Sequence, residues 1–344
     1  MAQKNVKYVD VVPAKAAQGL IRAVYDQARK EIGMLPDAVT MFSPSEQIGT
    51  ASWGLFREAL LSTGPAPRLV KEAVAAQVSK LNDCPFCVDA HSIMLYGGGA
   101  GTFATSLLSG APELAGDPEL TAVAEWAESV MIRPAGQVAA PFPGEQVPDV
   151  VGTLVEFHFL NRVINVLLAG TFLPGSNRVK AIARRVGGKV MAKRIKAPRA
   201  PGGAVGLAGG YPLPADLSWA APQPAIGAAL ARLAATTEAV ALELMPGAAI
   251  VAVGRALDRW DGQFRGPSRA WLAELLADLP AADQPAGRLA LLTALAPFQV
   301  TDADVEAFRA EHPADADLVG LVSWAAFAAA RRIGAWSVPA PAPV

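Results

Sequence analysis

Residues 69–95 read LVKEAVAAQVSKLNDCPFCVDAHSIML, and this stretch decides how the rest of the chain is interpreted. Apolar side chains recur every three or four positions from Leu69 to Leu81, which predicts an amphipathic helix. Asn82 and Asp83 interrupt the pattern, and Asp83 stands where its side chain would cap a second helix. The stretch therefore predicts two consecutive helices joined by a tight turn.

The only two cysteines of the chain fall in the first turn of the second predicted helix. Cys84 and Cys87 are three positions apart, and Pro85 occupies a place where a helix needs no N–H donor. The positive end of a helix dipole stabilises a thiolate, so we expect a lowered cysteine pKa here. One Cys-x-x-Cys without scattered cysteine pairs indicates redox chemistry first and half of a metal site second.

A histidine and a glutamate stand at spacings that can serve this cysteine pair. His91 follows Cys87 by four residues, one helical turn along the same face. Glu72 lies on the preceding helix, and two packed antiparallel helices could bring its carboxylate to the Cys/His pair. Cys87 is closer to His91 than Cys84 is, so we expect Cys87 to lose its proton more readily. Cys84, nearer the helix mouth, is expected to be the more exposed thiol.

The resulting pattern, Glu-x11-Cys-x2-Cys-x3-His, resembles the alkylhydroperoxidase D-like (AhpD-like) branch of the carboxymuconolactone decarboxylase family. It matches at Glu72, Cys84, Cys87 and His91, and the motifs Gly33-Met34-Leu35-Pro36-Asp37 and Trp53-Gly54-Leu55-Phe56 are also similar to that family. The resemblance covers roughly residues 20–170. It implies an all-helical fold, homo-oligomers and thiol peroxidase chemistry without a cofactor or a metal.

The resemblance also implies roles for the four residues. Cys87 attacks a hydroperoxide and becomes a sulfenic acid, and Cys84 condenses with it to a disulfide that an external thiol reductant opens. His91 and Glu72 relay protons. The chain departs from the pattern at Phe86, where the best-characterised peroxidases of the family carry a histidine, so slow turnover is expected.

Other interpretations of the same residues stay open. The site could belong to a disulfide oxidoreductase, or to a decarboxylase-like lyase or isomerase that uses His91 and Glu72 as acid and base. The cysteines could form a structural disulfide, or bind zinc together with His91 and Glu72. A non-catalytic interaction protein on the same scaffold is a further alternative, and it predicts inert thiols.

Composition and periodicity extend the helical prediction to the whole chain. Of 344 residues, 52% are apolar and 18% charged, which suits a sizeable buried core. Helical patterns recur at 20–32, at 48–60, after Asp117 as an N-cap, and from Pro148 to about Gly170, while strand-like alternation is absent, so the class is all-α. We predict an AhpD-like lobe at 1–196, a Pro/Gly-rich linker at 197–224, a second helical lobe at 225–337 and a disordered tail at 338–344.

The predicted second lobe contains a short segment whose sequence is similar to the cysteine motif. Ala296-Pro297-Phe298-Gln299-Val300 aligns with Cys84-Pro85-Phe86-Cys87-Val88 at an offset of 212 residues. In that register Ala303 replaces His91 and Gln284 replaces Glu72. If the chain arose by duplication, the second lobe packs and assembles but performs no thiol chemistry.

The charge and the targeting features of the sequence limit the classes of partner and the location that we predict. A formal net charge of −1 gives no global attraction to nucleic acid or to a membrane, and neither is predicted as a partner. The N-terminus lacks a signal-peptide pattern, and no uninterrupted run of 18 apolar residues occurs, so the cytoplasm is the expected location. The basic segment 177–196 is interpreted mainly as a solvated helix face, with binding of an anionic partner or nucleic acid as the alternative. His158 is interpreted mainly as a buried, hydrogen-bonded core residue rather than part of the site.

Overall fold

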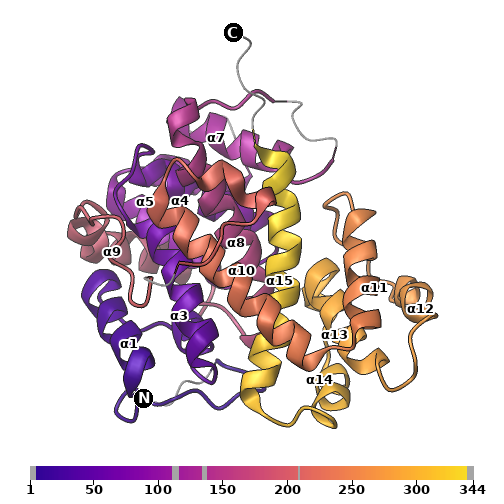
Figure 1. The fold of residues 1–344 in the computed structure, drawn as a ribbon. Helices are drawn as coiled ribbons and strands as arrows, with labels where there is room; N and C mark the ends of the chain where they lie inside the picture. The colour runs from indigo at the N-terminus through magenta and orange to yellow at the C-terminus, as the bar shows by residue number, and fades with distance from the viewer. Residues whose placement is uncertain (1–4, 111–115, 134–137, 208–209, 339–344) are drawn as a thin grey trace.

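The computed structural model describes residues 5–110, 116–133, 138–207 and 210–338 (Figure 1). These residues form helices and loops without a β-sheet, and a β-bridge joins Val6 to Leu168 within them. The all-α prediction is confirmed. Residues 339–344 of the predicted disordered tail lie outside the described residues.

The helices follow one another along the whole described chain. In order they are α1 (Gly19–Ile32), α2 (Asp37–Thr40), α3 (Glu46–Leu55), the π-helix η1 (Phe56–Leu61), α4 (Arg68–Leu81), α5 (Pro85–Gly98), α6 (Gly101–Ser109), α7 (Pro118–Ser129), η3 (Gly144–Gln146), α8 (Val147–Leu167), α9 (Asn177–Ile195), η4 (Ala215–Ala220), α10 (Pro224–Leu244), α11 (Gly247–Asp258), α12 (Ala270–Leu276), α13 (Gln284–Leu295), η5 (Pro297–Gln299), α14 (Asp302–Arg309) and α15 (Asp315–Ser337).

The turn between α4 and α5 sets the position of the cysteines. As predicted, α4 ends at Leu81 and Pro85 opens α5. The predicted capping role of Asp83 is wrong, because Asp83 has a left-handed backbone with φ of 48° and Cys84 occupies the N-cap position without a side-chain cap bond. Aspartate tolerates that conformation better than most residues, so it can turn the chain directly into the cysteine motif.

Helix α8 is the central element. It packs against α4 on one side and against α15 on another, while α10 packs on α3 and α15 (Figure 1). Helices α11 to α14 lie on the far side of α15 from α4 and α5 in the view of Figure 1. Helix α9 packs along α5, and Asp89 of α5 holds it through Arg184 at 2.5 Å and Lys180 at 3.7 Å.

Local sequence signals explain several helix ends. The Asp117 side chain accepts a hydrogen bond from Leu120 N at 3.1 Å, which confirms the predicted N-cap of α7. The helix predicted at 48–60 is divided into α3 and η1, because the hydrogen bonding widens to a π-helix at Phe56. Such π segments are frequent at functional sites.

Three helices are long and apolar enough to cross a membrane when judged by length and composition alone. These segments are Gly144–Leu167, α10 and α15, and 94%, 56% and 78% of their most apolar windows are buried inside the fold. Packing against other helices therefore accounts for most of that apolar surface.

The Pro/Gly-rich segment that follows α9 lies against η1. Arg57 donates to the Ala200 carbonyl at 3.1 Å, and the backbone N–H groups of Gly202 and Ala204 donate to the Glu58 carboxylate at 2.8 and 2.9 Å. In segment 296–300, whose sequence is similar to the cysteine motif, Pro297 opens the short helix η5 after α13, much as Pro85 opens α5 after α4. The division into two lobes and the duplication stay predictions.

Candidate active site

Glu72 and His91 are hydrogen-bonded to each other, although nineteen positions separate them. Helix α4 presents Glu72 and helix α5 presents His91, and the two helices pack along their lengths. The distance from Glu72 Oε2 to His91 Nδ1 is 2.7 Å, and both side chains are buried. The structure thus brings together two of the four residues that the motif singled out.

Arg68 completes this arrangement on the solvent side. One turn before Glu72 on α4, it places Nη2 at 2.6 Å and Nε at 2.8 Å from Glu72 Oε1. Burial alone would raise the pKa of Glu72, but the charges and hydrogen bonds of Arg68 and His91 outweigh it and lower that pKa. Glu72 is therefore a carboxylate at neutral pH.

The glutamate fixes which imidazole nitrogen can act as a base. Because ionised Glu72 only accepts hydrogen bonds, Nδ1 of His91 carries the proton and Nε2 keeps its lone pair in neutral His91. The edge-to-face contact with Phe157, at 4.5 Å between ring centroids, holds the ring orientation. Nε2 can thus take a proton from a group in the adjoining cavity.

Both cysteines are buried as free thiols, with Cys84 0% and Cys87 2% exposed. Burial raises the pKa of Cys87 well above its usual value, and contact with the Cys84 thiol raises it further. Hydrogen bonds from the Asn161 and Ser79 side chains oppose this rise without overcoming it. At neutral pH the resting form of Cys87 is therefore the thiol.

Two sequence-based predictions about the cysteines are wrong. The pKa of Cys87 is raised rather than lowered, because desolvation outweighs the helix dipole in a buried first turn. Cys84 is not the more exposed thiol, because the Asn82–Asp83 turn folds it against α4, where its N–H donates to the Ser79 carbonyl at 2.9 Å.

A second buried polar cluster lies on α8. Asn82 Nδ2 donates to His158 Nδ1 at 3.2 Å and to Asn161 Oδ1 at 3.0 Å. Arg162 donates to the His158 carbonyl at 2.8 Å and, across to α13, to the Ala294 carbonyl at 2.9 Å. Burial, with the Arg162 charge, lowers the pKa of His158 well below its usual value, so His158 is neutral. The prediction that His158 is a buried, hydrogen-bonded core residue is confirmed.

The cavity beside the thiol is almost entirely apolar. It has a volume of about 360 Å³ and opens between α5, α9 and the segment after α1. Its walls include Cys87, His91, Phe86, Ala90, Ile93 and Met94 of α5, Ala183, Gly187, Val190 and Met191 of α9, Ile32, Met34, Pro36 and Ala38, and Phe56, Leu160, Phe172 and Leu173. Cys87 and His91 therefore share one cavity, whereas Glu72 lies behind His91.

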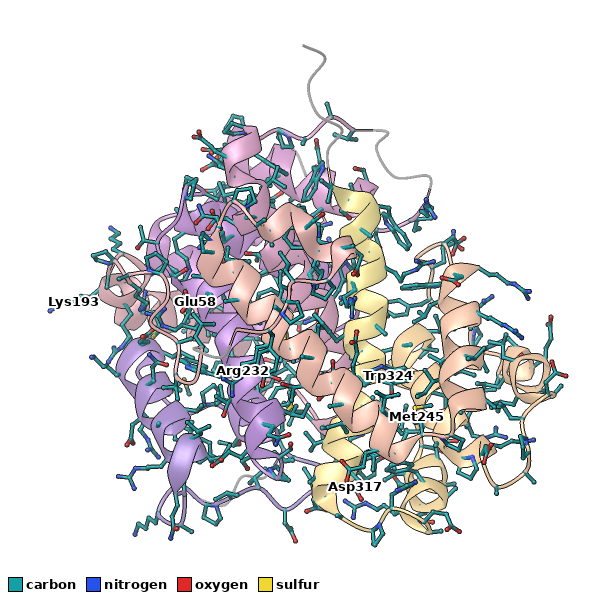
Figure 2. All side chains as sticks on the ribbon, viewed as in Figure 1. Glu58, Lys193, Arg232, Met245, Asp317 and Trp324 are labelled. Carbon is teal, nitrogen blue, oxygen red and sulfur yellow. The ribbon has the colours of Figure 1, made fainter. Side chains whose placement is uncertain are left out.

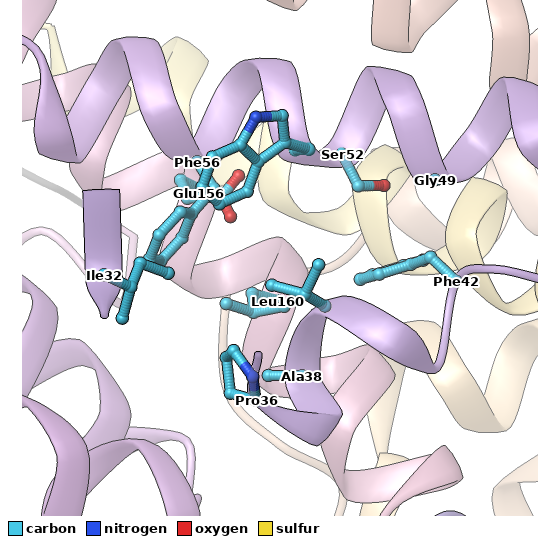
Figure 3. A pocket seen from close by; sticks show the side chains of 11 residues that line it. Ile32, Pro36, Ala38, Phe42, Gly49, Ser52, Phe56, Glu156 and Leu160 are labelled. Atoms are coloured by element: carbon cyan, nitrogen blue, oxygen red, sulfur yellow. The ribbon is translucent and has the colours of Figure 1, made fainter. Parts of the chain in front are cut away.

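An inner cavity of about 50 Å³ adjoins this space through walls that both share, among them Phe56 and Leu160 (Figure 3). Glu156 and Ser52 line it, and neither Glu156 Oε2 nor Ser52 Oγ has a hydrogen-bond partner among the described residues. Burial raises the pKa of Glu156 well above its usual value, so the carboxyl is neutral. A cavity of this size and polarity can hold water.

Sequence reasoning missed three polar neighbours of the motif. Arg68 carried a readable signal, since an arginine four residues before a glutamate on a helix faces it. Asn161 carried none, because its approach to Cys87 depends on how α8 packs on α4. Ser79 carried none, because its approach depends on the conformation of the turn between α4 and α5. Within the described residues, no group of three or more His, Cys, Asp or Glu side chains is arranged to hold a metal ion.

Comparison with known proteins places the chain in a family. No family model matches the chain. Over 333 residues, which make up 97% of this chain and 95% of the relative, it is 44% identical to the Mycobacterium tuberculosis protein named alkyl hydroperoxide reductase Rv2159c. Identity at that level along nearly the whole length of both chains means that this chain belongs to the same family as that alkyl hydroperoxide reductase.

Proposed function

We propose that the chain is a thiol-dependent peroxidase of the AhpD-like type, which reduces organic hydroperoxides through Cys87 and Cys84. The observation that carries the proposal is the buried Glu72–His91 hydrogen bond in the wall of the cavity that contains Cys87. The name of the 44% identical relative supports the reaction class. The apolar walls favour an organic hydroperoxide over hydrogen peroxide.

The first step transfers one oxygen atom to sulfur. His91 Nε2 takes the proton of the Cys87 thiol while the sulfur attacks the terminal oxygen of the hydroperoxide. The O–O bond breaks, Cys87 becomes a sulfenic acid, and the proton passes to the departing alkoxide to give an alcohol. This step needs a base, because the resting Cys87 is a protonated thiol and not a thiolate.

The second step closes the cysteine pair. The Cys84 sulfur displaces the hydroxyl of the Cys87 sulfenic acid, which forms a disulfide and releases water. The two thiols are already in contact, so this step needs little movement. Two electrons and two protons from an external thiol reductant restore both thiols.

Glu72 and Arg68 support the base without contacting the substrate. Glu72 holds the Nδ1–H tautomer of His91 and stabilises the imidazolium formed during proton transfer. Arg68 keeps Glu72 ionised. Phe86 lines the cavity where the resemblance expects a second relay residue, and it packs edge-to-face on Phe172. With one relay histidine fewer, we expect modest turnover.

Peroxide turnover with a panel of thiol reductants tests the proposal. The native chain should consume cumene hydroperoxide, Cys87→Ser should lose the reaction, and Cys84→Ser should accumulate a trappable sulfenic acid on Cys87. Reversed behaviour of the two variants would exchange the two roles. Unchanged rates in both variants would reject thiol catalysis and leave a lyase, isomerase or binding role for the site. Homo-oligomer formation and a cytoplasmic location stay predictions.

A further inference from the structure

Helix α9 carries a row of exposed apolar side chains. Val179, Ile182, Val186 and Val190 are 53%, 64%, 56% and 65% exposed. At about 100° per residue, Val179, Val186 and Val190 fall within about 40° of one another on the helix surface, and Ile182 lies next to them. We call these four residues the α9 stripe. A contiguous row of exposed apolar side chains typically marks an interaction surface rather than a simply solvated helix face.

The same helix is strongly basic on the flank beside the stripe. Arg178, Arg185 and Lys189 of α9 and Lys196 at its C-cap are exposed and group on one side at helical spacing. No ion pair joins them to another described residue, and no acidic residue occurs between 174 and 201. Lys193, also exposed, lies at the outer edge of the molecule in Figure 2. The overall charge of −1 therefore conceals a concentrated positive surface.

The stripe is continuous with the active-site cavity. Val190 belongs to the stripe and also lines the cavity that contains Cys87 and His91. Its neighbours Gly187 and Met191 line that cavity as well. Any surface seated on the stripe therefore lies against the mouth of the cavity.

We propose that α9 docks this mouth onto an anionic phospholipid surface. The apolar stripe would enter the boundary between headgroups and acyl chains, and the flanking bases would contact the anionic headgroups. A second copy of this chain is a poorer occupant for a symmetric α9–α9 contact, because it would bring two uncompensated basic flanks together. If the proposed peroxidase function holds, docking gives membrane-derived hydroperoxides direct access to Cys87.

Vesicle flotation with the full chain tests the docking without relying on catalysis, because the Cys87→Ser variant can be used. We expect binding to vesicles that contain phosphatidylglycerol, weak binding to pure phosphatidylcholine, and loss of binding as salt screens the charges. Lys189→Gln should lower the partition coefficient roughly fivefold. Ile182→Glu should lower it roughly tenfold or more, since it removes apolar contact and adds a like charge.

Leu242→Glu is the matched control, because Leu242 is 74% exposed on α10, away from α9. It should leave vesicle binding unchanged. The proposal fails if the chain ignores anionic vesicles, if neutral vesicles bind equally well, or if both glutamate variants weaken binding alike. It also fails if light scattering shows that Ile182→Glu dissociates an oligomer while vesicles do not bind.

An activity comparison separates this proposal from the peroxidase proposal. Ile182→Glu should reduce a phospholipid hydroperoxide embedded in anionic vesicles more slowly, while its rate with dissolved cumene hydroperoxide stays native. Equal rates of Ile182→Glu and the native chain with both substrates would overturn delivery from the membrane. Absence of all peroxidase activity, with vesicle binding intact, would overturn the peroxidase function but not the docking.

Discussion

Replacing Glu72 with glutamine removes one charge at the centre of the proposed relay and keeps the shape of the side chain. Glu72 is fully buried and accepts hydrogen bonds from Arg68 at 2.6 and 2.8 Å and from His91 at 2.7 Å. The amide leaves the mostly buried Arg68 guanidinium without a carboxylate. Breaking a buried ion pair in this way costs about 3–5 kcal/mol of folding free energy.

The same change should disable the base. If the amide N–H₂ faces His91, Nδ1 becomes the acceptor and the proton moves to Nε2, which then cannot take a proton from Cys87. If the amide oxygen faces His91, the imidazolium loses its counter-charge. Loss of general-base assistance corresponds to a rate decrease of about 10²–10⁴-fold.

The assay is stopped-flow oxidation of the reduced chain by cumene hydroperoxide, measured together with urea unfolding. Glu58→Gln is the matched control, because Glu58 is also a fully buried carboxylate paired with an arginine, Arg57, at 2.5 Å. Both variants should lose stability, and only Glu72→Gln should lose the oxidation rate. If Glu72→Gln oxidises at the native rate while its stability falls as in Glu58→Gln, Glu72 has a structural role and the relay is refuted.

Three further outcomes follow from the geometry. In Cys84→Ser, alkylation of Cys87 by iodoacetamide should still accelerate as the pH rises through 9.0, because burial raises the pKa of Cys87 above that usual value. An alkylation rate that reaches its plateau below pH 9.0 would contradict the raised pKa. Burial raises the pKa of Glu156 above its usual 4.5 in the folded chain, so the stability that this carboxyl contributes is present below pH 4.5 and is lost as the pH rises. The stability of Glu156→Gln relative to the native chain should therefore increase above pH 4.5. A stability difference in urea unfolding that does not change with pH would refute this. Asp117→Ala should lower the free energy of unfolding by about 1 kcal/mol, and Asp117→Ser should lower it much less, because a serine side chain can also accept the hydrogen bond from Leu120 N. Equal losses in the two variants would show that the loss of the N-cap is not the cause.

Local spacing was enough to predict the part of the site that two neighbouring helices determine. The 3.6-residue period of α4, the break at Asn82 and the one-turn spacing from Cys87 to His91 are short-range features, so the sequence predicts them. The pairing of Glu72 with His91 needed one further condition, that α4 and α5 pack antiparallel, and a short turn between two amphipathic helices favours that arrangement.

Features that depend on long-range packing were beyond such reasoning. The pKa of Cys87 depends on how completely α4 and α8 exclude water from the first turn of α5, and no local pattern reports this burial. The exposure of the α9 stripe depends on which side of α9 meets α5. From the sequence alone, the valines and isoleucine of α9 were as consistent with a buried face as with an exposed one.

In the proposed mechanism, burial of Cys87 links the protonated resting state of the thiol to the choice of oxidant. A raised pKa keeps the resting thiol protonated, so small oxidants and stray electrophiles meet a poor nucleophile. In the proposed mechanism, attack then requires proton removal by His91, whose Nε2 is available because Glu72 binds Nδ1. An organic hydroperoxide in the apolar cavity would exclude water and lie against Cys87 and His91 together, whereas hydrogen peroxide would fill little of a volume of about 360 Å³. In the proposed mechanism, the rate depends on how well the organic part of the substrate positions the peroxide. This dependence would explain how a site without a low-pKa cysteine can still select its oxidant.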